Sequence, residues 1–374
     1  LTLSTQYLKQ PNTPRIDELV PGFGQDEPSS EAFSFRPNKR EFYHARLRMT
    51  PDLKWLDEFE AHVARQDITD DRRTQEFGST IRVDEANESE LTGLTLGFRS
   101  QVGHQLQLRY GVEIYQDDIS SSRRETDLSS GLGMSAPARF PDGAEMDSLS
   151  GYLFGETSPT AALTISGGLR YSAFDIDLPQ AGGGNVGLEP DDLSGDLHLS
   201  WRASDSLNIV GNLGRGFRPP NIFDLGTLGA RPGNRFNVAN EDLDSESVVS
   251  IDAGIKFAGH RFRGEFFAFY SDYDDKITSV PTGDVTPDGR TVVRSENANQ
   301  LEIYGIEAGG HFNLSDRWEL YGVLNYARGD EKATGGQEDP ADRMPPLNGK
   351  LGAVYEPNQD NRLETFILFA DEQD

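Results

Sequence analysis

The chain has 374 residues, with 39 Gly, no Cys and a formal net charge of −27. Such an excess of carboxylates argues against nucleic acid as a partner, because phosphate neutralisation needs clustered Lys and Arg. The lack of cysteine excludes disulfides, thiolate metal sites and cysteine nucleophiles. Mean hydropathy is −0.58, and no apolar run approaches the roughly 18 residues of a membrane-spanning helix, so a helical membrane protein is excluded as well.

Apolar and polar residues alternate in many stretches of the chain. Between Gln105 and Tyr115 every second residue is Leu, Tyr, Val or Ile, and residues 193–201 and 317–326 repeat the pattern. A period of two residues indicates β-strands. We count about fifteen such segments of about ten residues each, the length that crosses a bilayer at a tilt.

The connections between these segments alternate between very short and long. Tight turns are predicted at residues 51–52, 102–104, 158–160, 203–205, 258–260, 314–316 and 358–360. Long polar loops are predicted at about 9–38, 67–90, 117–146, 177–191, 217–246, 272–298 and 329–347. In an up-and-down antiparallel sheet every second connection lies at the same end. The short turns should therefore share one rim and the long loops the other.

This asymmetry is typical of an all-β, antiparallel, up-and-down transmembrane β-barrel. Each of the three tryptophans, Trp55, Trp201 and Trp318, lies within a few residues of a tight turn, so we predict that they are membrane-interface aromatics at one rim. A soluble β-sandwich is the alternative, but its strands are shorter and its connections do not alternate in this way. The low mean hydropathy agrees with a barrel, because only alternate residues then face lipid.

An odd number of strands is unexpected for a bacterial barrel, whose strand numbers are even. An open sheet would also leave unpaired edges that are costly in lipid. The first residues already read as a strand, and the last residues break off within another one. We therefore expect residues 1–374 to be one partial barrel domain.

Two stretches resemble the TonB-dependent outer-membrane receptors. "GRGFRPPN" ends a strand abruptly at two prolines, and "NEDLDSE" leads into the next strand. Members of that family commonly carry a Gly-Phe-Arg-Ala/Pro-Pro-Asn stop followed by Asn-x-x-Leu-x-x-Glu. The matching residues here are Gly216, Phe217, Arg218, Pro219, Pro220 and Asn221, then Asn240, Leu243 and Glu246.

The resemblance implies a barrel of about twenty-two strands, of which this chain would supply strands five to nineteen. It also implies an outer-membrane receptor of Gram-negative bacteria that imports a scarce nutrient with energy from the TonB complex. The energy-coupling box and the plug domain of such receptors lie N-terminal to the barrel, and we expect both outside this chain. Outer-membrane lipid and lipopolysaccharide would be further partners.

Candidate binding residues cluster around the proline stop. In the functional interpretation Arg218, Asn221, Arg231 and Arg235 present polar groups to the cargo, with the guanidinium groups directed at an anionic chelate. In the structural interpretation Arg218 lies at the rim, the prolines end strand pairing, and Asn221 begins a turn. Neither interpretation is excluded by the sequence.

The preferred cargo is a ferric siderophore, by family frequency and by exclusion. Haem receptors of the family usually place a histidine ligand after the proline stop, but residues 217–246 contain none, so haem is the alternative cargo. No resident cofactor or metal is predicted, because the acidic clusters lack the spacing of a calcium loop. Catalytic motifs are absent, so we predict no enzyme. A passive pore or an adhesive barrel remains the alternative to a transporter.

Overall fold

The computed structural model describes residues 1–179, 184–226, 229–231, 234–333, 336, 338–341 and 344–372. Within this part of the chain, fifteen long strands pair antiparallel in chain order, as predicted. Their bounds are β1 Thr2–Gln10, β3 Ser30–Met49, β4 Glu58–Glu76, β5 Ile81–Val102, β6 Leu106–Asp127, β8 Ala144–Thr160, β9 Leu163–Pro179, β11 Asp191–Ser204, β12 Leu207–Arg218, β15 Glu246–Ala258, β16 Phe262–Val285, β17 Thr291–Ser315, β18 Trp318–Ala333, β20 Asn348–Asn358 and β21 Asn361–Ala370.

Shorter elements lie in the connections between the long strands. They are β2 Thr13–Pro14, β7 Gly133–Ala136, β10 Asn185–Leu188, β13 Gly229–Arg231, β14 Arg235–Val238, β19 Glu338–Pro340, α1 Ile16–Leu19 and α2 Ile222–Gly226. Neither described helix has the length and apolar character needed to span a membrane.

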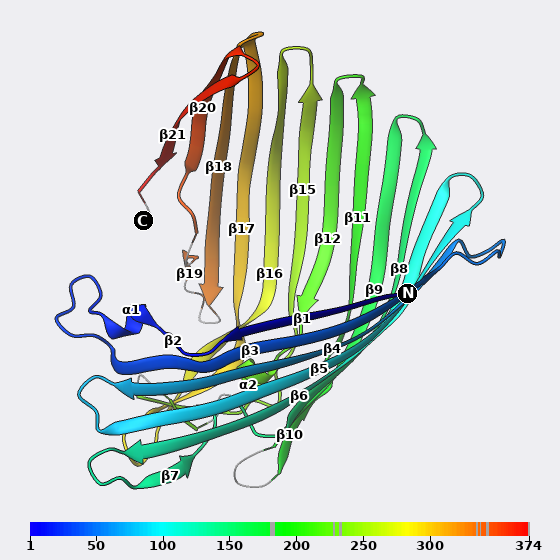
Figure 1. Cartoon of the computed structure of the whole chain (residues 1–374). Coiled ribbons are helices and arrows are strands. Elements are labelled where there is room, and N and C mark those ends of the chain that lie inside the picture. Colours follow the sequence, from blue (N-terminus) through cyan, green and yellow to red (C-terminus); the bar gives the residue numbers. More distant parts are fainter. Residues whose placement is uncertain are drawn as a thin grey trace.

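The sheet bends into an open, barrel-like curve whose two rims differ (Figure 1). Tight turns join β5 to β6, β8 to β9, β11 to β12, β15 to β16, β17 to β18 and β20 to β21 along one rim. The helices α1 and α2 and the short strands β7 and β10 lie toward the other rim (Figure 1). The predicted separation of short turns and long loops is therefore confirmed. Among the described residues β1 and β21 do not pair with each other.

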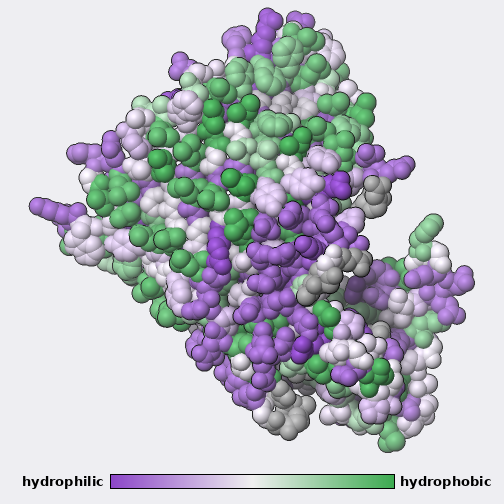
Figure 2. Space-filling view, turned by 180° about the vertical axis from the view of Figure 1, so that it is seen from behind, coloured by the Kyte–Doolittle hydropathy of each residue, from purple (hydrophilic) through white to green (hydrophobic). Residues whose placement is uncertain are grey.

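One face of the sheet carries large apolar side chains that no other layer of the described residues covers. Val112 and Ile114 on β6 are exposed, and so are Leu149, directly opposite Ile114 on β8, and Leu169 on β9. Figure 2 shows hydrophobic residues concentrated over the upper part of the strands, with a broad hydrophilic area below them. Burying apolar surface is worth about 25 cal/mol per Å². A face of this composition is therefore stable against hydrocarbon and unfavourable in water.

The long loops are shorter, and the strands longer, than the sequence predicted. The strands β5 and β6 each have 22 residues, and the expected loop at 67–90 contracts to residues 77–80. Likewise the expected loop at 272–298 contracts to 286–290. Apolar alternation reports contact with lipid and stops where the membrane ends. The backbone ladder needs no lipid and continues beyond the membrane as polar hairpins.

A small hydrophobic core lies under the connections of the long-loop rim. Ile176 and Leu178 of β9 pack with Val186 of β10, and all three are fully buried or nearly so. Leu225 of α2 and Leu243 complete the cluster from the segment between β12 and β15. That segment therefore folds inward against β9 and β10.

Candidate functional site

The proline stop ends strand β12 and begins helix α2. Pairing with β15 ends at Arg218, and Pro220 is fully buried. Asn221 caps α2, because its side-chain Oδ1 accepts a hydrogen bond from the backbone N–H of Asp224 at 3.0 Å. In return, Asp224 Oδ2 accepts the backbone N–H of Asn221 at 3.0 Å. This reciprocal arrangement is a capping box, and it fixes the direction in which the chain leaves the strand.

Arg218 binds two carboxylates at the C-terminal end of β12. Its Nε donates to Glu246 at 2.7 Å, and its Nη1 donates to Asp224 at 2.7 Å. The hydrogen bond with Glu246 raises the pKa of Arg218 above its usual value. Burial tends to raise the pKa of Glu246, but hydrogen bonds from Arg218 and from the backbone N–H of Ile277 outweigh it, so this pKa is lowered. The guanidinium group is therefore already occupied by protein carboxylates.

The other motif residues anchor the same segment. Asn240 donates a 2.9 Å hydrogen bond to the carbonyl of Ser295 on β17, and Leu243 is buried in the core. The Phe217 ring packs edge-on against Phe174, with centroids 6.1 Å apart. Close packing does not require glycine at position 216, because a Cβ there would meet only Val248, at an ordinary contact distance of 3.5 Å.

Arg231 and Arg235 face each other across a hairpin. Their backbones pair where β13 ends and β14 begins, and β14 then runs parallel to β17, with Arg235 opposite Thr291. Asn234 adopts a left-handed φ of 57° and donates to the carbonyl of Gly289 at 3.0 Å. These bonds fix the backbone on both sides of Arg235. The side chain of Arg231 lies outside the described part of the structure.

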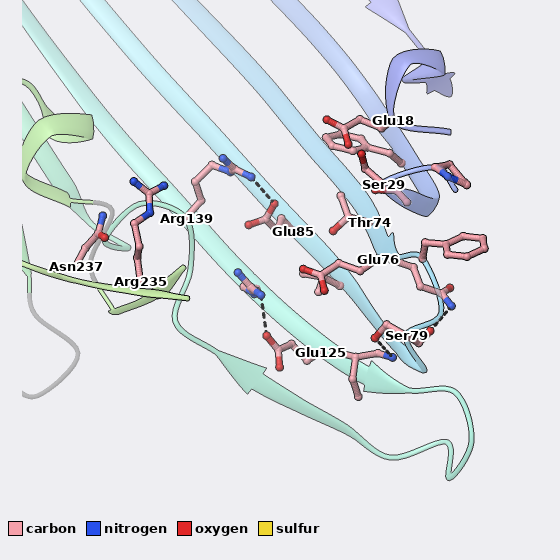
Figure 3. Close-up of a pocket in the computed structure, with 18 of the residues that line it drawn as sticks. Glu18, Ser29, Thr74, Glu76, Ser79, Glu85, Glu125, Arg139, Arg235 and Asn237 are labelled. Atoms are coloured by element: carbon pink, nitrogen blue, oxygen red, sulfur yellow. Dashed lines mark hydrogen bonds and ion pairs between the residues drawn. The ribbon is translucent and has the colours of Figure 1, made fainter. Parts of the chain in front are cut away.

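A cavity of about 1230 Å³ lies at the long-loop rim, and Arg235 lines it. Figure 3 shows Arg235 and Asn237 on one side, with Glu18, Ser29 and Thr74 across from them. The walls come from the segment before β3 with the start of that strand, the β4–β5 hairpin, the stretch from β6 to the connection before β8, the segment after β12 and the β16–β17 hairpin. The cavity is thus formed by segments far apart in sequence.

The cavity is charged, and most of its cations are already paired. Arg139 contacts Glu85 at 3.1 Å, and the Glu85 side chain is only 4% exposed. Arg123 contacts Glu125 at 2.8 Å, and Figure 3 marks both ion pairs. Arg235 is exposed, and no ion pair joins it to another described residue. Among the described lining residues it is therefore the arginine whose charge no protein carboxylate offsets.

The structure separates three of the four predicted binding residues into two groups, and the side chain of the fourth, Arg231, lies outside the described part of the structure. Arg218 and Asn221 hold Asp224, which lines the cavity, whereas Arg235 lines the cavity itself. Sequence analysis did not single out Arg123, Arg139 or the carboxylates paired with them. One signal was available, because every residue that lines the cavity falls within a segment predicted as a long loop.

The three tryptophans lie at the rim of tight turns. Trp55 is in the turn between β3 and β4, Trp201 is near the end of β11, and Trp318 begins β18. All three are substantially exposed. Trp318 stacks on Tyr355 of the neighbouring strand, with ring centroids 4.5 Å apart.

Comparison with known proteins agrees with this architecture. The family described as TonB dependent receptor-like, beta-barrel, matches residues 2–371. The chain belongs to the TonB-dependent receptors. The family membership predicted from the proline stop is therefore confirmed, as is the location in the Gram-negative outer membrane.

Two individual proteins are similar to parts of this chain. The ferric enterobactin receptor PirA of Pseudomonas aeruginosa is 30% identical over 144 residues, which are 32% of this chain and 19% of PirA. Hemoglobin-haptoglobin utilization protein B of Neisseria meningitidis is 24% identical over 179 residues, covering 42% of this chain and 22% of that protein.

The fold is also that of solved TonB-dependent receptors. The hemophore receptor HasR of Serratia marcescens, solved as a double mutant with its hemophore HasA and heme, superposes with a TM-score of 0.73 and 15% identity. The match covers 99% of this chain and 62% of HasR. The chain thus spans less than two thirds of the length of this receptor, and the matches to the two curated relatives cover about a fifth of each.

Proposed function

We propose that this chain is the barrel portion of a receptor that binds a ferric siderophore complex outside the cell and imports it with energy from the TonB system. The cavity at the long-loop rim carries the proposal, because five separate segments of that rim converge on it. Its volume of about 1230 Å³ exceeds that of most small-molecule pockets and suits a bulky metal chelate. The similarity to a ferric enterobactin receptor supports this class of cargo.

Haem is the second candidate, because two of the similar proteins are named for hemoglobin and for a hemophore with heme. The cavity favours the siderophore. No histidine is among the described residues that line it. In the described strands, His44 bonds to His62 at 3.0 Å and His311 bonds to Glu319 at 3.0 Å. These histidines are engaged with neighbouring side chains of the barrel wall.

Uptake of radiolabelled iron tests the proposal. The intact receptor is expressed in iron-starved Gram-negative cells that lack other receptors for the supplied siderophores. We expect accumulation of iron in cells with TonB and none above background in cells without it. Growth on haem alone, with no uptake of any ferric siderophore, would favour the second candidate. Equal uptake with and without TonB would indicate a passive pore.

A further inference from the structure

The lining of the cavity carries more negative than positive charge. Six carboxylates line it, from Glu18, Glu27, Glu76, Glu85, Glu125 and Asp224, against the three guanidinium groups of Arg123, Arg139 and Arg235. The whole chain has the same sign, with a formal net charge of −27. A field of this sign raises the local concentration of cations and repels anions.

Ion pairs inside the cavity wall neutralise most of the charged side chains that line it. Arg139 and Arg123 are neutralised by Glu85 and Glu125. Asp224 is held by Arg218 at 2.7 Å, and Glu18 lies 3.6 Å from Arg15. Each of these groups already has a counter-ion, so together they contribute little net charge toward a ligand.

Three charged side chains of the lining have no counter-ion among the described residues. Glu27 and Glu76 are exposed, and neither forms an ion pair with another residue of the described ranges. Arg235 is the corresponding cation. The cavity therefore offers two carboxylates and one guanidinium group, together with hydroxyl groups from Ser29, Thr278 and other lining residues. A ligand with several negative charges would meet one counter-ion and two repelling groups.

Resting on the function proposed above, we infer that the cargo is a neutral or monocationic ferric chelate, such as a hydroxamate complex with a protonated amine, and not a trianionic catecholate complex. Arg235 would donate hydrogen bonds to the neutral chelate oxygens, because a guanidinium group has five N–H donors. Glu27 and Glu76 would accept the ammonium group. This assignment reverses the anionic chelate expected from the sequence.

Three ferric probes and two variants test the inference. The intact receptor in outer membranes is titrated with a linear trihydroxamate complex that has a free amine, with the same complex after N-acetylation, and with a tris-catecholate complex. We expect the monocation to bind at least about tenfold more tightly than the trianion, equivalent to about 1.4 kcal/mol. The acetylated neutral complex should fall between them.

In the double variant Glu27→Gln, Glu76→Gln the ratio of the affinities for the monocation and the trianion should decrease several-fold. The matched control Glu241→Gln, Asp242→Asn removes two exposed carboxylates from the segment after β12 that do not line the cavity. This control variant should leave the ratio of the two affinities unchanged. Tighter binding of the trianion, or equal effects of the two double variants, would overturn the charge assignment alone. Binding of none of the three complexes would overturn the siderophore function and this inference with it.

Discussion

Arg218 and Glu246 are the last residue pair of the β12–β15 ladder, and their side chains are joined by a 2.7 Å hydrogen bond. The pair closes the two ends of the segment that carries Arg235 and α2. Arg218 also binds Asp224. One guanidinium group therefore links the first and the last residues of this segment. The arginine of the proline stop thus has a structural role at the cavity.

Replacing Arg218 by Ala should loosen residues 219–245 without unfolding the barrel. The side chain is 41% exposed, so its two ion pairs are discounted to about 1 kcal/mol. This corresponds to about fivefold faster limited proteolysis in the segment. Arg215→Ala, which removes an ion pair with Asp192 on β11, is the matched control. Equal rates of cleavage within residues 219–245 in both variants would contradict the proposed structural role of Arg218.

Acid should loosen the same segment. The pKa of Glu246 is lower in the folded protein than in an unfolded chain, where it is about 4.3. Its contribution is therefore complete above that unfolded value and is lost as the pH falls through the folded pKa. Hydrogen exchange of residues 219–245 should rise as the pH is lowered below about 4. In Glu246→Gln the exchange, corrected for its intrinsic pH dependence, should be faster at neutral pH and should change little across this range.

The order of strands and the approximate position of each tight turn could be predicted from the sequence, because lipid contact imposes a period of two on every membrane-crossing segment. The turn predicted at 158–160, for instance, lies at 161–162. Phe266 and Ile306, for example, lie on the exposed apolar face of β16 and β17. The proline stop could also be located, since two prolines after Arg218 cannot pair. These features are local and need no knowledge of distant residues.

The composition of the cavity could not be predicted, because it depends on how far each hairpin extends beyond the membrane. Arg139 meets Glu85 across 54 positions of sequence, and this contact requires β5 and β6 to continue as a ladder to residues 81 and 127. Polar residues in such hairpins follow no lipid-imposed pattern. The sign of each charge in these hairpins could be read from the sequence, but the convergence of the charged residues on one cavity could not be predicted.

Arg235→Ala should weaken cargo binding while leaving the barrel intact. Its guanidinium group is exposed in the cavity wall, and no ion pair within the described residues depends on it. Loss of a charged hydrogen bond to the cargo should reduce affinity about tenfold. Arg290→Ala is the control, because Arg290 pairs with Asp288 and does not line the cavity. Titration of intact receptor measures the affinity, and equal affinities of both variants would remove Arg235 from the binding site.

The tryptophans should report one membrane interface. Three variants that each retain one of Trp55, Trp201 and Trp318, with Phe at the other two positions, are placed in vesicles of brominated lipid. Because all three lie at the tight-turn rim and are exposed, lipids brominated near the headgroup should quench each fluorescence more than lipids brominated at the chain end. A tryptophan that no lipid quenches would be excluded from the interface.

Gly111 on β6 should tolerate no side chain, because the barrel wall is closely packed there. A Cβ at this position would lie 2.3 Å from the carbonyl oxygen of Leu96 and 2.7 Å from the hydroxyl of Tyr152. The backbone of β5 would have to move, at a cost of about 1–3 kcal/mol. Gly111→Ala should therefore lower the urea midpoint of the barrel in detergent micelles. Gly214→Ala is the matched control, since its nearest neighbour would be the carbonyl oxygen of Gly195 at 3.9 Å. If both variants unfold at the same urea concentration, the close contact at Gly111 does not limit stability.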